Sequence, residues 1–291
     1  AVVSRIKILS GMNVAEHRLP QDGQAQVDHH HRIIDMRVSV IPSIYGESTV
    51  IRILDKSMSL RQMTDVGFTD KDRHIFSALL RKSHGLILVT GPTGCGKSTT
   101  LYASLQDVIT TGNNIITVED PVEYHVDGLM QIQVNPVIGY TFARALRHIL
   151  RHDPDVIMVG EIRDLETARM AVESSLTGHI VLSTLHTNSA ATSVTRLIEM
   201  GIPPYLVNTS LLAILAQRLV RRNCQYCMVE DTVPEEVREV LGICPEEQFF
   251  HGAGCEHCHK TGYHGRMAVY ELLTVTPGLR KLIEPDAVAA D

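Results

Sequence analysis

A glycine-rich stretch with one lysine and one serine is the part of this sequence whose residue types and spacing most directly indicate chemistry. It matches G-x-x-x-x-G-K-[ST], a loop that binds phosphate groups. The glycines let backbone N–H groups approach the phosphates, the lysine reaches the β- and γ-phosphates, and the serine hydroxyl holds Mg²⁺. The sequence therefore predicts a nucleotide-binding loop, with Lys97 also catalytic and Ser98 also the Mg²⁺ ligand, made of Gly91, Pro92, Thr93, Gly94, Cys95, Gly96, Lys97, Ser98 and Thr99.

Two acidic stretches are candidates for the metal partner and for the group that orients the attacking water. Glu161 follows the apolar run 156–159, and an acid at the carboxyl end of a parallel strand lies beside such a loop. We interpret it as the carboxylate that acts on Mg²⁺, directly or through water; capping of the following helix is the alternative. Glu119, Asp120 and Glu123 end an earlier strand, where a carboxylate could orient water. A solvated surface loop is the alternative there.

Two histidines bracket the apolar run 180–185. His179 precedes it and His186 follows it. A single histidine is usually structural, but His186 comes at the carboxyl end of the expected strand, on the edge that carries the glycine-rich loop. A contact between His186 and the γ-phosphate would let the nucleotide state move the following helix. His179 is a candidate for nucleotide binding and His186 for catalysis.

Four cysteines form two C-x-x-C pairs, Cys224 with Cys227 and Cys255 with Cys258, separated by 27 residues. Two such pairs are typical of a structural Zn²⁺ site with four thiolate ligands. The separation is long, so we expect the chain between the pairs to fold back as a lobe of its own. Nothing indicates secretion, which disfavours disulfides. A closed shell of four thiolates leaves no open position, so zinc would stabilise the fold rather than catalyse.

These residues need a scaffold, and alternating strands and helices predict one. Apolar runs predict strands near 86–90, 115–119, 130–134, 155–159 and 180–184. Helices are expected near 97–110, 141–151, 165–176 and 189–200. Such alternation implies an α/β fold with a largely parallel sheet covered by helices. A helix near 205–221, a strand near 267–273 and a helix near 277–284 are expected to follow.

The beginning of the chain has a different pattern. A helix or strand is expected over Val2–Leu9, a turn over 18–23, a loop at His29–His31, and strands near 34–40 and 49–54. This indicates a small α+β unit. The expected organisation is an α+β unit at 1–56, a linker with helical stretches at 57–84, an ATPase-type core at 85–223, a cysteine-bearing module at 224–265, and a closing strand and helix at 266–291.

Composition excludes some classes of function. The chain has 291 residues, 27 basic and 33 acidic side chains and a net charge of −6. This balance argues against nucleic acid as a partner, because binders of nucleic acid usually carry a basic face. No apolar run approaches the ~18–20 residues of a membrane span, and no signal peptide starts the chain. The chain lacks an initial methionine and is expected to be a fragment of a longer protein.

Four blocks of the sequence closely resemble the secretion ATPase superfamily. They are GPTGCGKSTTLYASL (91–105), ITVEDPVEY (116–124), RHDPDVIMVGEIRDLETA (151–168) and TGHIVLSTLHTN (177–188), which are similar to that family's Walker A, Asp box, Walker B and His box. The resemblance covers nearly the whole chain. The four-cysteine insert looks like the branch that serves type II secretion and pilus assembly, and unlike the retraction branch, which lacks it.

The resemblance implies a RecA-like P-loop NTPase core and, at 1–56, the remnant of a PAS-like α+β module. It implies that Arg37 and Arg52 reach nucleotide across a domain or subunit boundary, and that the catalytic glutamate is Glu123, with Glu119 as the near alternative. It also implies ATP as substrate, a homo-hexamer, and a cytoplasmic location on the inner membrane. Contact with the inner-membrane secretion platform would use an amino-terminal domain absent from this chain. The stretch 24–31 departs from the family pattern, which leaves the strand pairing of the first unit open.

Together these features predict a motor that hydrolyses ATP and powers pseudopilus assembly in type II secretion. Type IV pilus assembly is the alternative for the system served. A nucleotide-gated assembly scaffold and a nucleic-acid translocase are two further candidate functions. The intact Lys97, Glu161 and Glu123 argue against the scaffold.

Overall fold

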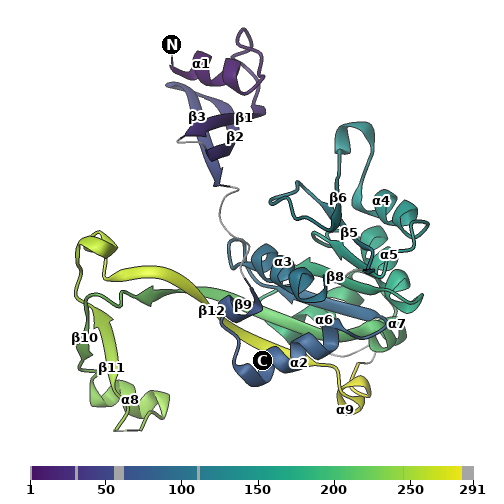
Figure 1. Cartoon of the computed structure of the whole chain (residues 1–291), viewed down its shortest axis with the longest axis vertical. Helices are drawn as coiled ribbons and strands as arrows, with labels where there is room; N and C mark the ends of the chain where they lie inside the picture. Colours follow the sequence, from purple (N-terminus) through teal and green to yellow (C-terminus); the bar gives the residue numbers. More distant parts are fainter. Residues whose placement is uncertain (1, 30–31, 56–61, 110–111, 245, 284–291) are drawn as a thin grey trace. The chain divides into compact units, whose positions relative to one another are not determined.

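The computed structural model describes residues 2–29, 32–55, 62–109, 112–244 and 246–283. The chain divides into two compact units (Figure 1). The first holds Ala1–Leu60 with Pro121–Asp127, and the second holds Arg61–Asp120 with Gly128–Asp291. Of the histidine run, His30 and His31 lie outside the described residues. No helix within the described ranges is long and apolar enough to cross a membrane.

The first unit is a three-stranded antiparallel sheet with one helix. The chain runs through α1 (Val2–Leu9), β1 (Gln21–His29), β2 (Arg32–Ser43) and β3 (Gly46–Asp55), and the sheet order is β1-β2-β3. The strands predicted near 34–40 and 49–54 are confirmed. The turn predicted over 18–23 is wrong from Gln21 onward, and His29 ends a strand rather than lying in a loop. β1 is mostly polar, so its sequence is only a weak indication of a strand. Its antiparallel pairing with β2 makes it one.

A buried lysine links the helix of this unit to its sheet. The Lys7 side chain is 0% exposed; its ammonium group pairs with the Glu47 carboxylate and donates to the Glu16 carbonyl oxygen at 2.6 Å. His17 Nδ1 lies 3.0 Å from the other oxygen of Glu47. A charge removed from water is tolerated only with such partners, so this cluster fixes α1 against the start of β3.

The cluster makes the stability of the first unit depend on pH. The hydrogen bond between Glu47 and Lys7 is the largest cause that lowers the pKa of Glu47. A carboxyl group with a depressed folded-state pKa stabilises the fold above its unfolded pKa of about 4.3, and this contribution disappears as the pH falls through the folded-state pKa. We expect hydrogen-exchange protection of α1 and β3 to fall below about pH 4. In Glu47→Gln, protection should be lower at neutral pH and change less with acid; an equally steep profile in that variant would contradict this.

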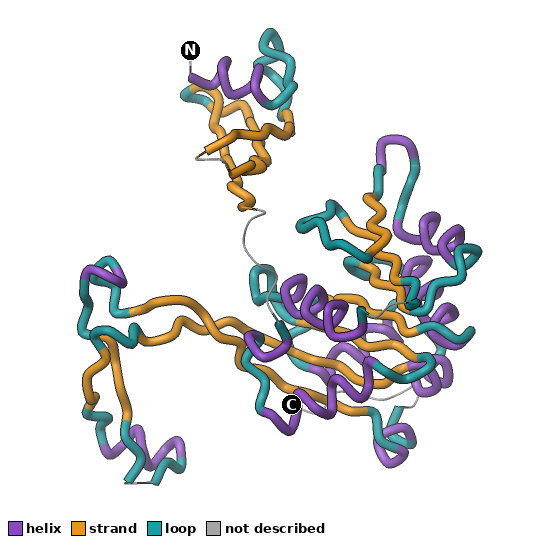
Figure 2. The backbone as a smooth tube through the Cα atoms, viewed as in Figure 1, coloured by secondary structure: helices purple, strands orange, loops and turns teal. Residues whose placement is uncertain are grey.

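The second unit is built on a seven-stranded sheet with the order β12-β9-β4-β8-β7-β5-β6. All of its strands run parallel except β12, which pairs antiparallel with β9. Figure 2 shows the strands in orange and the helices in purple. The strands are β4 (Gly85–Thr90), β5 (Ile115–Glu119), β6 (Leu129–Gln133), β7 (Val156–Val159), β8 (Ile180–Leu185), β9 (Leu211–Asn223) and β12 (Tyr263–Thr274). The five strands predicted for the core and the α/β class are confirmed.

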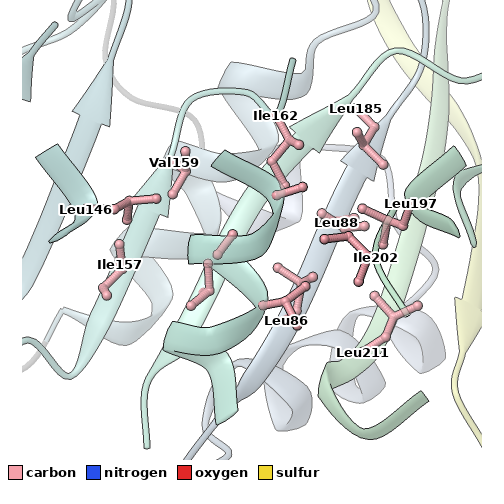
Figure 3. Packing of buried hydrophobic residues seen from close by; sticks show 14 of the residues in the cluster. Leu86, Leu88, Leu146, Ile157, Val159, Ile162, Leu185, Leu197, Ile202 and Leu211 are labelled. Atoms are coloured by element: carbon pink, nitrogen blue, oxygen red, sulfur yellow. The ribbon is translucent and has the colours of Figure 1, made fainter. Parts of the chain in front are cut away.

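Helices cover both faces of this sheet, and each face has its own apolar core. Along β4, Leu86 and Leu88 belong to one core and Ile87 and Val89 to the other, because successive strand residues point to opposite faces. The first core takes residues from α4 (Phe142–Ile149), α5 (Leu165–Leu176), α6 (Ala190–Glu199) and α7 (Pro204–Ser210) (Figure 3). The second takes residues from η1 (Met63–Asp65), α2 (Asp70–Leu80) and α3 (Lys97–Val108). The four predicted core helices are confirmed within two residues at each end.

The stretch 57–84, which we interpret from the sequence as a linker with helical segments, carries η1 and α2 in its described part. Phe76 and Leu80 of α2 are fully buried in the second core. Thr69 caps this helix, accepting the Asp72 N–H. From residue 62 onward the stretch therefore packs as part of the second unit.

The helix predicted over 205–221 is wrong beyond Ser210. α7 ends there, and the same run continues as β9, which pairs with β4 on one side and β12 on the other. Residues 211–217 are buried throughout. A run buried on both faces shows no alternation, so periodicity does not separate it from a buried helix, and sheet pairing decides.

β9 and β12 continue together as a ribbon that carries the cysteine-bearing module (Figure 1). The lobe expected between the cysteine pairs is present, built from β10 (Met228–Asp231), α8 (Glu235–Leu241), β11 (Phe249–Gly252) and η3 (Glu256–Cys258), with β10 antiparallel to β11. The strand predicted near 267–273 is confirmed within β12. The helix predicted near 277–284 is the shorter α9 (Pro277–Arg280), and 284–291 lies outside the described residues.

Candidate functional site

The glycine-rich loop connects β4 to α3, which is the strand–loop–helix context that the motif requires. Gly91, Gly94 and Gly96 have positive φ angles of 142°, 78° and 92°. At Gly91, a Cβ atom would lie 2.3 Å from the Gln217 carbonyl oxygen, so only glycine lets the loop approach β9. α3 begins at Lys97, and the unpaired N–H groups of a helix's first turn favour an anion.

Lys97, His186 and Glu161 form a row of polar contacts at the carboxyl edge of the sheet. Lys97 Nζ donates to the Gly91 carbonyl oxygen at 2.8 Å and lies 3.5 Å from His186 Nδ1. On the other side of the ring, His186 Nε2 lies 3.4 Å from Glu161 Oε2. These residues follow the neighbouring parallel strands β4, β8 and β7. A neutral imidazole with its proton on Nε2 satisfies both contacts.

The Lys97 ammonium lies partly out of water, over the loop. Besides Gly91, it donates to the Pro92 carbonyl oxygen at 3.2 Å. Burial is the largest cause that lowers the pKa of Lys97, and the neighbouring Cys95 and Glu161 act in the opposite direction. Because the surroundings screen charge less than water does, the attraction of this ammonium for a phosphate is stronger than at an exposed site.

Glu161 also pairs with Arg163, a residue absent from our sequence-based candidates. Arg163 Nη2 contacts Glu161 Oε1, and its Nη1 lies 3.9 Å from Asp120 Oδ2. The hydrogen bond with Glu161 is the largest cause that raises the pKa of Arg163. Asp164 caps α5, its Oδ1 accepting the Thr167 N–H at 2.8 Å. The capping alternative for Glu161 is therefore wrong.

Glu119 lies in a buried hydrogen-bonded cluster. It is 5% exposed. The Tyr102 hydroxyl donates to Oε2, and Oε1 accepts from Thr117 Oγ1 at 2.6 Å and from Gln131 Nε2 at 3.3 Å. Both carboxylate oxygens thus bind protein donors, so Glu119 ties β5 to α3 and β6 rather than facing solvent.

His179 lies at the opposite edge of the sheet from the glycine-rich loop. It precedes β8, and its carbonyl oxygen accepts the N–H of Gly85, the first residue of β4. Its Nδ1 lies 2.9 Å from the Ser174 carbonyl oxygen of α5. β4 has six residues at about 3.3 Å each, which puts roughly 20 Å between this edge and the loop. The structure does not bring His179 to the loop.

The remaining candidates belong to the first unit. Arg37 of β2 and Arg52 of β3 are direct partners in the antiparallel register, so they share one face of the sheet. Arg37 is half-buried and Arg52 is exposed. Glu123 is half-buried in the segment 121–127, which groups with this unit.

The structure brings the four predicted cysteine ligands together. Their sulfur atoms all lie within 4.8 Å of one another. The distances are 3.8 Å for Cys224–Cys255, 3.8 Å for Cys227–Cys258 and 3.7 Å for Cys255–Cys258. Zinc in tetrahedral coordination, with bonds of about 2.3 Å, separates its sulfur ligands by about 3.8 Å, whereas a disulfide bond is about 2.05 Å long. The cysteines therefore fit a four-thiolate metal site.

Backbone amides polarise two of these sulfurs. Cys258 Sγ accepts the N–H groups of Cys255 at 3.1 Å and Gly262 at 3.3 Å, and Cys227 Sγ accepts that of Gly254 at 3.3 Å. The Cys255 amide is the largest cause that lowers the pKa of Cys258 to about 6, while burial raises the pKa of Cys227 to about 12. The thiolate is the form of cysteine that binds a metal, and the two backbone amides that contact Cys258 Sγ favour this form.

The sequence model of the family described as "Type II/IV secretion system protein" matches residues 1–290. The chain belongs to this family. Among curated members of the family, the type II secretion system protein E of Aeromonas hydrophila is 52% identical over 97% of this chain. The type II secretion system ATPase E of Vibrio cholerae is 49% identical over 98% of it. The chain spans 57% of the length of each of these relatives.

Two solved structures share the fold. The pilus retraction motor PilT, crystallised with ADP, is 30% identical with a TM-score of 0.66, covering 91% of this chain and 66% of that one. The ATPase DotB of Yersinia pseudotuberculosis has a TM-score of 0.68 at 20% identity over 96% of this chain and 69% of that one, which shows the fold alone. The expected α/β ATPase-type core with a small amino-terminal unit is confirmed.

Besides Arg163, two residues that contact the candidate site were absent from the sequence-based candidates. Gln217 of β9 bonds the glycine-rich loop, and Tyr102 of α3 bonds Glu119. Gln217 left a signal, because it is a buried, uncharged polar residue directly after the apolar run 211–216. Tyr102 left none, since a tyrosine on a helix is ordinary.

Proposed function

We propose that this chain is the nucleotide-hydrolysing part of a type II secretion ATPase, a motor that powers pseudopilus assembly. The observation that carries the proposal is the row Lys97–His186–Glu161 beside a complete phosphate-binding loop. Relatives about half identical in sequence, one of them named an ATPase, support it. These relatives are longer than this chain, which spans 57% of their length, so the coupling of hydrolysis to secretion is part of the proposal.

In this proposal, the loop and its neighbouring side chains bind different parts of ATP and its Mg²⁺. Backbone N–H groups of the loop and of the first turn of α3 bind the β- and γ-phosphates, and Lys97 exchanges its loop carbonyls for phosphate oxygens. Ser98 and Glu161 offer the hydroxyl and carboxylate oxygens that Mg²⁺ prefers. When bound, Mg²⁺ neutralises charge on the transferred phosphoryl group. His186 lies between Lys97 and Glu161, where it contacts the γ-phosphate.

Glu123 is the carboxylate that orients the attacking water in this proposal. Glu119, the other Asp-box glutamate, holds its oxygens on Tyr102, Thr117 and Gln131. A general base needs a lone pair directed at water, which favours Glu123.

Arg37 and Arg52 take a nucleotide phosphate in this proposal. Like charges directly opposite each other on a sheet are destabilising, so their pairing is unfavourable unless an anion binds. A guanidinium is always charged and binds phosphate through two hydrogen bonds. Assembly as a homo-hexamer would supply such a site from neighbouring copies.

A cavity of about 70 Å³ beside the first turn of α3 is the proposed place of one part of the nucleoside, because it is too small for the whole group. Thr99 and Gly96 line it from the loop side. Leu219 and Met267 supply apolar surface, as a base requires, and Asp65 supplies a carboxylate.

Zinc is the metal proposed for the cysteine cluster, with a structural role. The cluster has four sulfur ligands and no open position, which suits Zn²⁺. The proposed location is the cytoplasmic face of the inner membrane, with secretion platform proteins as partners and no role for nucleic acid.

Glu161→Gln tests the function. Losing the carboxylate should lower kcat for ATP hydrolysis by about 10²–10³-fold, because charge stabilisation in the transition state is lost, while ATP binding survives. Steady-state hydrolysis and ATP affinity are to be measured on the same samples. The control is Glu166→Gln, which makes the same chemical change at a carboxylate that is 63% exposed and paired with Arg147. Unchanged turnover in Glu161→Gln would overturn the assignment.

The same variant separates a motor from a scaffold. If Glu161→Gln binds ATP and still supports assembly in cells, a nucleotide-gated scaffold is favoured over a motor. Type IV pilus assembly is the second candidate for the system served, because PilB of Thermus thermophilus is 47% identical over 97% of this chain. Complementation of strains lacking either ATPase distinguishes the two systems.

A further inference from the structure

We propose that Gln217 is a positioning residue that holds the phosphate-binding loop from the neighbouring strand β9. The inference rests on the proposed function, because it concerns the loop that binds ATP. Gln217 is 4% exposed. Its Nε2 donates to the Cys95 carbonyl oxygen at 2.7 Å, and its Oε1 accepts from Thr100 Oγ1 at 2.9 Å.

The two bonds lie on either side of the residues that act on phosphate. Cys95 comes two residues before Lys97, and Thr100 comes two residues after Ser98. One side-chain amide therefore fixes both the end of the loop and the first turn of α3. A rotation of α3 or a shift of the loop breaks one of these bonds and leaves a buried polar atom unpaired. The amide thus fixes where Lys97 and Ser98 present their groups.

The backbone around Gln217 shows that the loop is fitted to this strand. A Cβ on Gly91 would lie 2.3 Å from the Gln217 carbonyl oxygen, and a Cβ on Gly96 would lie 3.1 Å from Gln217 Nε2. Glycine at both positions lets the loop lie directly against β9. β9 is itself held by β4 on one side and β12 on the other, so the amide projects from a rigid element.

An ordinary buried glutamine would affect only stability, whereas a positioning residue affects nucleotide binding and turnover. A displacement of about 1 Å at a catalytic group costs about 10²-fold in rate. Gln217→Met keeps the volume and removes both bonds. Gln217→Glu keeps the acceptor for Thr100 and loses the donor to Cys95, and Thr100→Val removes only the helix bond.

The experiment uses the full chain and measures the ATP dissociation constant, KM, kcat and thermal unfolding for each variant. Gln217→Met should raise the ATP dissociation constant and KM about tenfold and lower kcat about 10–100-fold. Gln217→Glu and Thr100→Val should each show part of this effect. Ser104→Ala is the matched control: Ser104 is a buried hydroxyl on α3 that donates to the Thr100 carbonyl oxygen at 2.7 Å, and its loss should affect unfolding without changing KM or kcat.

The outcomes separate this inference from the proposed function. If the parent hydrolyses ATP and the Gln217 variants stay within twofold of it in affinity, KM and kcat, the positioning role is overturned and the function stands. If the parent binds ATP without hydrolysing it, the function fails, and the ATP dissociation constants still decide the role of Gln217. If Gln217→Met does not fold, the milder Gln217→Glu and Thr100→Val carry the test, and an effect no greater than that of Ser104→Ala overturns the inference.

Discussion

Lys97→Ala should abolish measurable Mg²⁺-dependent ATP hydrolysis, with a fall in kcat/KM of about 10²–10³-fold or more. The variant removes the one lysine of the loop, whose ammonium is held over the phosphate position by Gly91 and Pro92. It also removes the contact between Lys97 Nζ and His186 Nδ1, while the contact of His186 with Glu161 remains. Because Lys97 is partly buried, its attraction for a phosphate is weakly screened, and a neutral water molecule in its place would not supply that attraction.

Steady-state hydrolysis of the parent and Lys97→Ala, each at several protein concentrations, checks this result. Lys82→Ala is the control, since it removes an exposed lysine outside the site. Parent activity that rises faster than linearly with concentration would indicate a site completed by a second copy, as the proposed role of Arg37 and Arg52 requires. A linear dependence would contradict that role, and Lys97-independent hydrolysis would contradict the assignment of the site.

The parts of the fold that local sequence determines could be predicted. Short apolar runs of sequence indicate the strands β4, β5 and β7. The capping aspartate Asp164 marks the residue before α5 begins. Conversely, residues 211–217 of β9 are buried on both faces and show no alternation. β1 alternates, but its less polar face offers only Gly23, Ala25 and Val27, which is a weak signal for a strand. Their structure comes from pairing with strands distant in sequence, which a local pattern does not contain.

The candidate site shows the same division. The glycine-rich loop and the cysteine pairs are contiguous motifs, and their spacing was sufficient to find them. The roles of His179 and Glu119 depend on which edge of the sheet a residue occupies and on which neighbours its side chain meets. His179 lies at the edge away from the loop, and Glu119 is held by donors from α3 and β6. The position of His179 before its strand already indicates the edge away from the loop, whereas the neighbours of the Glu119 side chain are not visible in the sequence.

Cys258→Ser should unfold the cysteine-bearing module while leaving the seven-stranded sheet folded. The only buried apolar side chains among the described residues of 224–262 are those of Cys224 and Cys258, and α8 buries none. The module therefore lacks a hydrophobic core of its own among its described residues, and we expect it to depend on the proposed zinc. Structural zinc sites contribute about 10–16 kcal/mol of apparent binding free energy at pH 7, comparable to the whole stability of a typical domain.

Metal analysis and hydrogen exchange on the full chain measure this effect. The parent should carry one zinc per chain and show protection in β10 and β11; Cys258→Ser or chelation should remove both and leave protection in β4 and β8. Cys244→Ser is the matched control, because Cys244 is exposed and outside the cluster. Zinc affinity should fall with acidification, since protons compete for the thiolates, including that of Cys258 with its pKa of about 6. Retained protection in metal-free protein would show that the lobe folds without its metal, and the structural role of zinc would be wrong.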